Sequence, residues 1–228
     1  MLTPARRRGV EILDDASVDP AVRRRSHADI ASSNRWLGGL RAAMGEVRGA
    51  ARGLASATLL DVGTGLADIP AGVRDAAART GTAITIFGVD EAPTLLAASR
   101  ERLDGAVCAS ALALPFRDGS IDIVLCSQLL HHFENTHAEQ LLREMNRVAG
   151  RAVIVSDLRR SWFAAAGFWL VAVALRFHRV TRHDGVVSVL RGFTAPELAR
   201  LVRNATGAEA RVRRKLGYRL TARWAPGA

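Results

Sequence analysis

The pattern of apolar and polar positions changes near residue 57. Before that point the chain shows no strand pattern. Apolar or small residues recur at helical spacing between Pro20 and Gly38, the pair Gly38-Gly39 breaks the pattern, and residues 40–54 form a second helical pattern. We therefore expect residues 1–56 to form an N-terminal helical extension. It either packs over one edge of the following sheet or forms a lid over a substrate pocket.

From Thr58 onward, short apolar runs alternate with amphipathic segments. The runs predict strands at 58–62, 83–90, 106–109, 121–127 and 152–157, with helices between them at 68–80, 93–103 and 136–149. This alternation is typical of a parallel sheet covered on both faces. Residues 208–216 and 218–224, around Gly217, predict an antiparallel hairpin. We expect an α/β fold over residues 57–228, with a Rossmann-like doubly wound sheet that is mostly parallel and ends in this hairpin.

One segment in this second half is apolar around its whole circumference. Residues 161–175 contain about 15 consecutive uncharged residues, fewer than the roughly 20 that a membrane-spanning helix requires. Arg176, Arg179 and Arg182 follow it. The segment forms the first part of an expected helical insertion at about 160–192. Three interpretations remain open: a buried helix, the wall of an apolar substrate pocket, and a peripheral contact with a membrane surface.

Composition narrows the class of protein. The chain has 228 residues, of which 49% are hydrophobic, as expected for a globular protein. The formal net charge is +10, but the cations are scattered arginines with Lys215 as the only lysine, so we expect no nucleic-acid partner. Cys108 and Cys126 fall in separate predicted strands that look buried, without a metal-binding spacing; we expect no metal. No apolar segment follows the basic N-terminus, which favours a cytoplasmic protein.

A glycine turn after the first strand is the main candidate binding element. The stretch Leu59-Leu60-Asp61-Val62-Gly63-Thr64-Gly65 reads as a buried strand that breaks into a tight turn. A helix should begin nearby, with Asp68 as its N-cap and Pro70 close to the first position. The dinucleotide pattern GxGxxG and the phosphate-binding GK[ST] ending are both absent. Asp61 would repel a pyrophosphate, and it suits a ligand that carries a cation or an amine.

Two later segments extend this site. Asp90 ends the second strand, where its carboxylate can accept both hydroxyls of a ribose; the alternative is that it caps the next helix. Leu114-Pro115-Phe116 forms a turn after the third strand. The fourth strand then leads into the run Cys126-Ser127-Gln128-Leu129-Leu130-His131-His132.

Taken together, these motifs resemble the class I S-adenosylmethionine-dependent methyltransferases over about residues 56–157. The resemblance is greatest to the branch that contains small-molecule O-methyltransferases and quinone-biosynthesis C-methyltransferases. It implies S-adenosylmethionine as the cofactor. By position, it also implies contacts with that cofactor from Asp61, Gly63, Thr64, Gly65, Asp90, Glu91, Ser110, Ala111, Ser127 and Gln128. Two positions depart from the family pattern: Ala67 replaces a glycine, and Ser110 replaces an aspartate.

The same region holds the candidates for proton transfer. Methyl transfer to a hydroxyl requires removal of a proton, and a neutral imidazole is suited to this at neutral pH. His131 and His132 follow the fourth strand, and we expect only one of them to face the pocket, because adjacent residues do not share a helical face. The alternative is a packing or capping pair. Asp157 is the third catalytic candidate, either orienting a histidine or binding substrate. Arg159, Trp162 and His183 are candidates for the substrate pocket.

We therefore predict a methyltransferase that acts on a small apolar acceptor, of aromatic, polyketide-like or quinone-like character, as in secondary metabolism. O-methylation with histidine-assisted proton removal is the first hypothesis. The alternatives are a C-methyltransferase of quinone biosynthesis, a nucleic-acid methyltransferase and a non-catalytic cofactor-binding protein. The sequence leaves the natural acceptor and the oligomeric state open.

Overall fold

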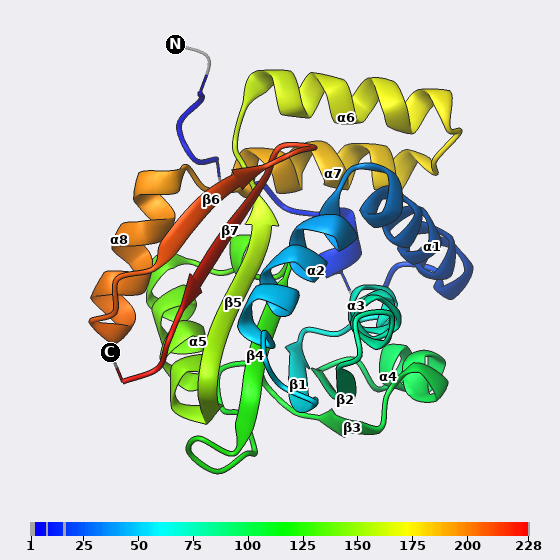
Figure 1. Cartoon of the computed structure of the whole chain (residues 1–228). Helices are drawn as coiled ribbons and strands as arrows, with labels where there is room; N and C mark the ends of the chain where they lie inside the picture. Colours follow the sequence, from blue (N-terminus) through cyan, green and yellow to red (C-terminus); the bar gives the residue numbers. More distant parts are fainter. Residues whose placement is uncertain (1–2, 8, 16, 228) are drawn as a thin grey trace.

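A seven-stranded mixed sheet forms the centre of the structure, a computed structural model that describes residues 3–7, 9–15 and 17–227 (Figure 1). Five parallel strands are followed by an antiparallel pair, as the sequence predicts. The chain builds the sheet outward from β1 in both directions, so the carboxyl ends of β1 and β4 meet at a switch point, where α/β sheets bind ligands. The strand order is β3 (Gly105–Cys108), β2 (Ala83–Asp90), β1 (Ser56–Val62), β4 (Ile121–Ser127), β5 (Ala149–Leu158), β7 (Arg219–Trp224) and β6 (Arg211–Lys215).

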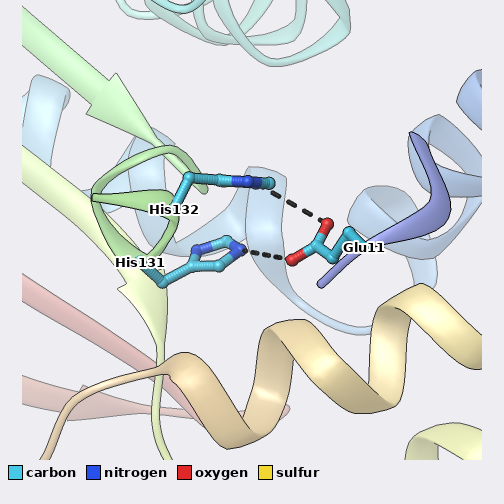
Figure 2. A group of neighbouring side chains, drawn as sticks. All are labelled: Glu11, His131 and His132. Atoms are coloured by element: carbon cyan, nitrogen blue, oxygen red, sulfur yellow. Dashed lines mark ion pairs between the residues drawn. The ribbon is translucent and has the colours of Figure 1, made fainter. Parts of the chain in front are cut away.

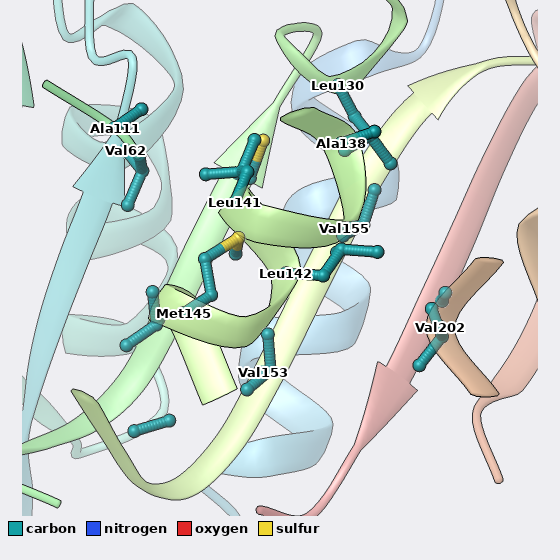
Figure 3. Close-up of a cluster of buried hydrophobic side chains, with 14 of the residues drawn as sticks. Val62, Ala111, Leu130, Ala138, Leu141, Leu142, Met145, Val153, Val155 and Val202 are labelled. Atoms are coloured by element: carbon teal, nitrogen blue, oxygen red, sulfur yellow. The ribbon is translucent and has the colours of Figure 1, made fainter. Parts of the chain in front are cut away.

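Helices cover both faces of the sheet. α2 (Gly39–Ala50) and α3 (Asp68–Ala78) pack on one face, and α5 (Asn135–Val148) and α8 (Ala195–Thr206) on the other. α5 is amphipathic, and it buries Ala138, Leu141, Leu142, Met145 and Val148 against the strands (Figure 3). α8 begins with the capping box of Thr194 and Glu197. α4 (Pro93–Ser99) and the short 3-10 turn η2 (Arg100–Arg102) complete the layers beside β2 and β3.

The remaining elements gather at the end of the sheet toward which the β5 arrow points (Figure 1). They come from distant parts of the sequence, so this end of the sheet is assembled only by the tertiary fold. They are η1 (Ile12–Asp14), α1 (Pro20–Trp36), η3 (Leu130–His132), α6 (Trp162–Ala174) and α7 (Arg179–Arg191). None of the helices in the described part of the chain is long and apolar enough to cross a membrane.

Several local expectations need correction. α2 lies on a face of the sheet, where Ala43 and Val47 are fully buried. The alternative that the N-terminal extension packs over one edge of the sheet is therefore wrong for this helix. The N-cap of α3 is Ala67, in the left-handed conformation with φ of 53°, and Asp68 is the first helical residue. Cys108 is exposed because β3 is a short edge strand, whereas Cys126 is buried in β4.

α1 also differs from the expected pattern, since its buried residues are polar: Ser26, Asp29, Ser33 and Asn34. The Asp29 carboxylate accepts hydrogen bonds from the backbone N–H of His178 (2.7 Å) and from the Thr181 hydroxyl (3.1 Å). This side of α1 therefore holds the start of α7 and faces a polar interior. The predicted N-terminal extension also includes residues 1, 2, 8 and 16, which lie outside the described residues.

Candidate active site

The glycine turn is held firmly between β1 and β2. The backbone N–H groups of Gly63 and Thr64 both donate to the carbonyl of Val89, at 2.8 and 3.0 Å. The N–H of Gly65 donates to the Asp90 carboxylate at 2.8 Å. Gly63 has φ of 71°, and a Cβ there would lie 2.6 Å from the Leu129 side chain, so a larger residue would strain the turn. The turn thus presents a fixed backbone at the carboxyl end of β1.

Three polar atoms beside this turn are buried without a hydrogen-bond partner among the described residues: Asp61 Oδ1, Thr64 Oγ1 and Ser127 Oγ. Unpaired buried polar groups are costly, so such a group in a native structure often marks a ligand site. Burial raises the pKa of the Asp61 carboxyl to about 8; the nearby Thr64 hydroxyl opposes this rise, and the charges of Asp68 and Asp90 add to it. A ligand with a positive charge and N–H donors would satisfy all three atoms.

A cavity of about 290 Å³ opens in front of the turn. Seven of the ten predicted cofactor residues line it: Asp61, Gly63, Thr64, Gly65, Asp90, Ser127 and Gln128. The other three do not. Glu91 is exposed, the Ser110 hydroxyl accepts from the N–H of Leu112, and Ala111 packs into the hydrophobic core.

Asp90 is not a helix cap. The N-cap of α4 is Ala92, and the two Asp90 oxygens accept from the N–H groups of Gly65 and Ala92. These bonds fix the orientation of the carboxylate, and each oxygen retains a lone pair for a further donor. The position at the end of β2 is thus compatible with hydroxyl binding, whereas the capping alternative is wrong.

Gln128 lines both this cavity and a second one. Its backbone takes the left-handed conformation with φ of 53°, and its N–H donates to the carbonyl of Ser156. Its side-chain amide donates to Asn34 of α1 and accepts from Arg219 of β7 at 2.5 Å. Burial lowers the pKa of the Arg219 guanidinium to about 10, with Asp157 opposing that effect. Nothing in the sequence near Gln128 indicates these two distant partners.

His131 and Asp157 form a buried pair at the carboxyl ends of adjacent strands. Asp157 Oδ1 lies 2.7 Å from His131 Nδ1, and Oδ2 accepts from the His131 backbone N–H at 3.1 Å. Burial favours the neutral acid, but the His131 ring and the backbone donors lower the pKa of Asp157 below its ordinary value. An ionised carboxylate only accepts hydrogen bonds, so the proton of a neutral His131 ring resides on Nδ1. The buried Nε2 then carries a lone pair, and it has no hydrogen-bond partner among the described residues.

His132 lies against His131, with ring centroids 4.4 Å apart (Figure 2). Both Nε2 atoms face Glu11 of the N-terminal segment, at 3.9 Å for His131 and 3.8 Å for His132. The expectation that only one histidine would face the pocket is wrong. Both rings, carried by the 3-10 turn η3, lie on the side that faces Glu11. Although burial lowers the pKa of His132, the carboxylates of Asp14 and Glu11 outweigh it and raise that pKa overall.

The second cavity, of about 100 Å³, adjoins the first. Glu11, Ile30, Gln128 and His132 line both, and His131 lines only the second. Much of its wall is apolar, including Leu158, Phe168 and Val189. The Phe168 ring packs onto Gly185 of α7, where an added Cβ would lie 2.0 Å from the ring. A polar cavity at the glycine turn thus meets a smaller, more apolar cavity at the histidines.

The three predicted substrate-pocket residues line neither cavity. Arg159 stacks on Tyr218, with its guanidinium carbon 4.6 Å from the ring centroid. Trp162 is 42% exposed and is covered in part by Arg7. The His183 side chain is largely exposed and pairs with Asp184 at 2.8 Å. α6 places Trp162 and α7 places His183 on the outer side, and Phe168 and Asp184 face inward instead.

Comparisons with known proteins agree with this architecture. Residues 60–154 match the family model described as a methyltransferase domain. An uncharacterised methyltransferase-like protein of Schizosaccharomyces pombe is 38% identical over 65 residues, which is 28% of this chain and 24% of that protein. The chain thus matches about a quarter of the length of this curated relative.

Solved structures share the fold at low sequence identity. The plantazolicin methyltransferase BpumL, in complex with SAH, superposes with a TM-score of 0.70 at 11% identity, covering 92% of both chains. An S-adenosylmethionine-dependent methyltransferase of Aquifex aeolicus gives a TM-score of 0.54 at 16% identity, over 75% of this chain and 82% of that chain. The magnesium protoporphyrin IX methyltransferase of Synechocystis, with bound SAM, gives a TM-score of 0.52 at 11% identity, over 95% of this chain and 88% of that chain.

Residues 60–154 therefore match a methyltransferase domain, and the described chain has the fold of the class I S-adenosylmethionine-dependent methyltransferases. S-adenosylmethionine is the methyl donor that this domain implies. The residues present fit it, because the donor carries an ammonium group and a sulfonium, and the unpartnered Asp61 carboxylate lies at the glycine turn.

Proposed function

We propose that the protein transfers the methyl group of S-adenosylmethionine to a hydroxyl oxygen of a small, largely apolar acceptor, with His131 as the general base. The observation that supports this best is the buried His131–Asp157 pair. Asp157 holds the proton on Nδ1, His131 lines the more apolar of two adjoining cavities, and its buried Nε2 has no hydrogen-bond partner among the described residues. This is how an imidazole is arranged when it must accept a proton.

Each group then has a distinct task. When bound, S-adenosylmethionine supplies a methyl group already activated on a positively charged sulfur. Asp61, Thr64 and Ser127 bind the donor, and Asp90 accepts from its ribose. Leu158, Phe168 and Val189 exclude water around the acceptor. His131 Nε2 removes the hydroxyl proton, and Asp157 stabilises the imidazolium that results. The same base would serve a C-methyltransferase that acts on an acidic carbon.

The N-terminal segment completes the site in this proposal. Glu11, Leu13 and Asp14 of the segment around η1 line the donor cavity, as do Arg23, His27, Ile30 and Asn34 of α1. We assign residues 3–7, 9–15 and 17–36 the role of a lid over both cavities. α2 belongs to the sheet layers instead, so the expected extension divides into a lid and a core helix.

The experiment that tests the function combines donor binding with product analysis. Calorimetry with S-adenosylhomocysteine should show binding. Incubation with S-adenosylmethionine that carries a deuterated methyl group should label phenolic or enolic acceptors, and fragmentation of the product should place the label on oxygen. Label on carbon would favour the C-methyltransferase. Binding without transfer to any acceptor would favour a non-catalytic cofactor-binding protein. Steeply salt-dependent binding of RNA or DNA would instead indicate a nucleic-acid methyltransferase.

A metal-assisted reaction is a second candidate, because ligand atoms of Glu11, His131 and His132 lie within 4.8 Å of one another (Figure 2). Against it, Glu11 Oε1 is already engaged by Ser188 Oγ at 2.8 Å and by Arg191 Nη1 at 3.2 Å. The guanidinium would repel a divalent cation at this carboxylate.

We therefore expect dialysis against EDTA to leave the turnover rate unchanged within twofold, and cobalt(II) to give no visible absorption band typical of histidine ligation. A chelated protein that loses activity and regains it with a divalent cation would contradict this expectation. In that case Glu11→Gln should weaken the cation site, and the matched substitution Glu139→Gln, on the surface of α5, should not.

A further inference from the structure

The outer side of α6 is an apolar surface that the other described residues leave largely exposed, with Arg7 covering part of the Trp162 ring. Trp162, Phe163, Trp169, Leu170 and Val173 are each between 37% and 61% exposed. We call these five residues the outer face of α6. The buried side of the helix is made of small residues, Ala164, Ala165 and Ala172, which pack toward α7. In Figure 1, α6 is the outermost element at the top of the molecule, beyond α7.

Soluble monomeric proteins rarely expose so many large apolar side chains together, so the outer face indicates an interaction. Its length argues against a membrane span. α6 has 13 residues, which is roughly 20 Å of helix, whereas a bilayer core is about 30 Å thick. A helix of this length can lie in the interface, with its apolar side toward the acyl chains.

The charges around α6 favour an anionic surface as the partner. Residues 158–183 contain five arginines and no aspartate or glutamate; one of the five, Arg160, is buried and paired with Glu197. Arg7 lies over the Trp162 ring at the N-terminal end of α6, 4.8 Å from its centroid, and Arg176 and Arg179 are exposed just after its C-terminal end. A second copy of the chain packed across this face would bring like charges together. A bilayer rich in anionic lipid would attract them, by about 1 kcal/mol per arginine in typical cases.

From these observations we propose that α6 is an interfacial helix that binds the protein to the surface of an anionic lipid bilayer. The outer face enters the headgroup region, and Arg7, Arg176 and Arg179 contact lipid phosphates. On the opposite side of the same helix, Phe168 lines the more apolar cavity. α6 therefore lies between the bilayer and the acceptor cavity. Vesicle binding requires no methyl transfer, so this inference stands or falls independently of the proposed function.

The test measures partition of the full chain into vesicles. The parent protein should sediment with vesicles of equal phosphatidylglycerol and phosphatidylcholine, and much less with pure phosphatidylcholine or at high salt. The double variant Trp169→Ser/Leu170→Ser should lower the partition coefficient on the order of tenfold or more. The matched control is Trp36→Ser, which removes a 72% exposed tryptophan of α1 that lies outside the outer face; it should bind as the parent does. A second variant, Arg176→Gln/Arg179→Gln, should reduce binding to anionic vesicles only.

Brominated lipids should quench the fluorescence of the parent and of Trp36→Ser more than that of a Trp162→Ser/Trp169→Ser variant. Unchanged thermal midpoints and S-adenosylhomocysteine binding would show that the variants fold. Equal partition of the parent and of Trp169→Ser/Leu170→Ser would overturn the proposal. So would a dimer, seen by analytical ultracentrifugation without vesicles, that the same double variant dissociates, since a second copy would then be the partner.

Discussion

Replacing His131 by alanine is expected to lower kcat by about 10²–10⁴-fold, while the dissociation constant for S-adenosylhomocysteine changes little. A positioned general base contributes about this factor to a proton transfer. His131 does not line the donor cavity, so donor binding should be retained. Single-turnover kinetics with a phenolic acceptor measure the first quantity, and calorimetry measures the second.

The acidity of the acceptor distinguishes a base from a structural residue. A phenol that is already ionised at the assay pH needs no base, so the loss in His131→Ala should shrink to a few-fold with such an acceptor. A small imidazole in the buffer should partly restore the variant. Asp157→Asn should lower kcat as well, by roughly 10-fold or more, because an amide can no longer accept from His131 Nδ1, the His131 N–H and the Leu158 N–H together.

His137→Asn is the control for these variants, because His137 is exposed on α5. It should behave as the parent does. An equal loss of kcat for ionised and neutral acceptors in His131→Ala would contradict a base at this position. It would leave His131 as a residue that shapes the pocket.

Replacing Asp61 by asparagine is expected to have opposite effects on binding and on stability. Affinity for S-adenosylmethionine should fall about 10–100-fold, because a charge-assisted bond to a buried carboxylate is lost. The free energy of unfolding of the ligand-free protein should rise by about 1–3 kcal/mol at pH 8 to 9, because an unpartnered buried carboxylate is removed. Calorimetry and chemical denaturation measure the two effects.

The pH dependence follows from the raised pKa of Asp61, about 8 in the folded protein against an ordinary value of 3.8. Between these values the folded state binds a proton that the unfolded state has lost. The free energy of unfolding therefore decreases as pH rises from about 4 to 8. Donor binding favours the ionised carboxylate, so affinity should weaken as pH falls below about 8, with release of a proton. In Asp61→Asn, both the pH dependence of the free energy of unfolding and that of donor affinity should be absent over this range.

Asp122→Asn is the matched control on the neighbouring strand. Asp122 lies near the opposite end of the sheet and accepts from both the N–H and the hydroxyl of Thr58. This variant should lower stability and leave donor affinity unchanged. If Asp61→Asn instead lowers stability as Asp122→Asn does, then Asp61 is an ordinary structural carboxylate.

Local patterns in the sequence were sufficient to predict most of the fold. The alternation of buried strands with amphipathic helices defines a parallel sheet, because each apolar run must be covered on both faces. The glycine turn was equally readable, since its positive φ angles favour glycine at Gly63 and Gly65. The predictions from sequence were wrong at the boundaries of some helices and about which side of a helix is buried. Ala67 takes a left-handed conformation that its residue type does not favour. α1 buries a polar side, in which Asp29 bonds to the start of α7 and Asn34 lines the donor cavity.

For the candidate active site, too, one part was predictable from the sequence and another part was not. The sequence by itself determined the sheet, the donor-binding turn at Asp61 and the presence of His131, His132 and Asp157 at the ends of strands, because these depend on residues close together in the chain. Only the tertiary structure decided that Asp157 holds His131, that Glu11 faces both histidines and that Arg219 and Asn34 fix Gln128. Those contacts join residues from 26 to 121 positions apart, for which no local pattern exists. The sequence of α6 also could not show which of its sides faces outward, because the segment is apolar all around. Only the packing of α6 on α7 selects the exposed face.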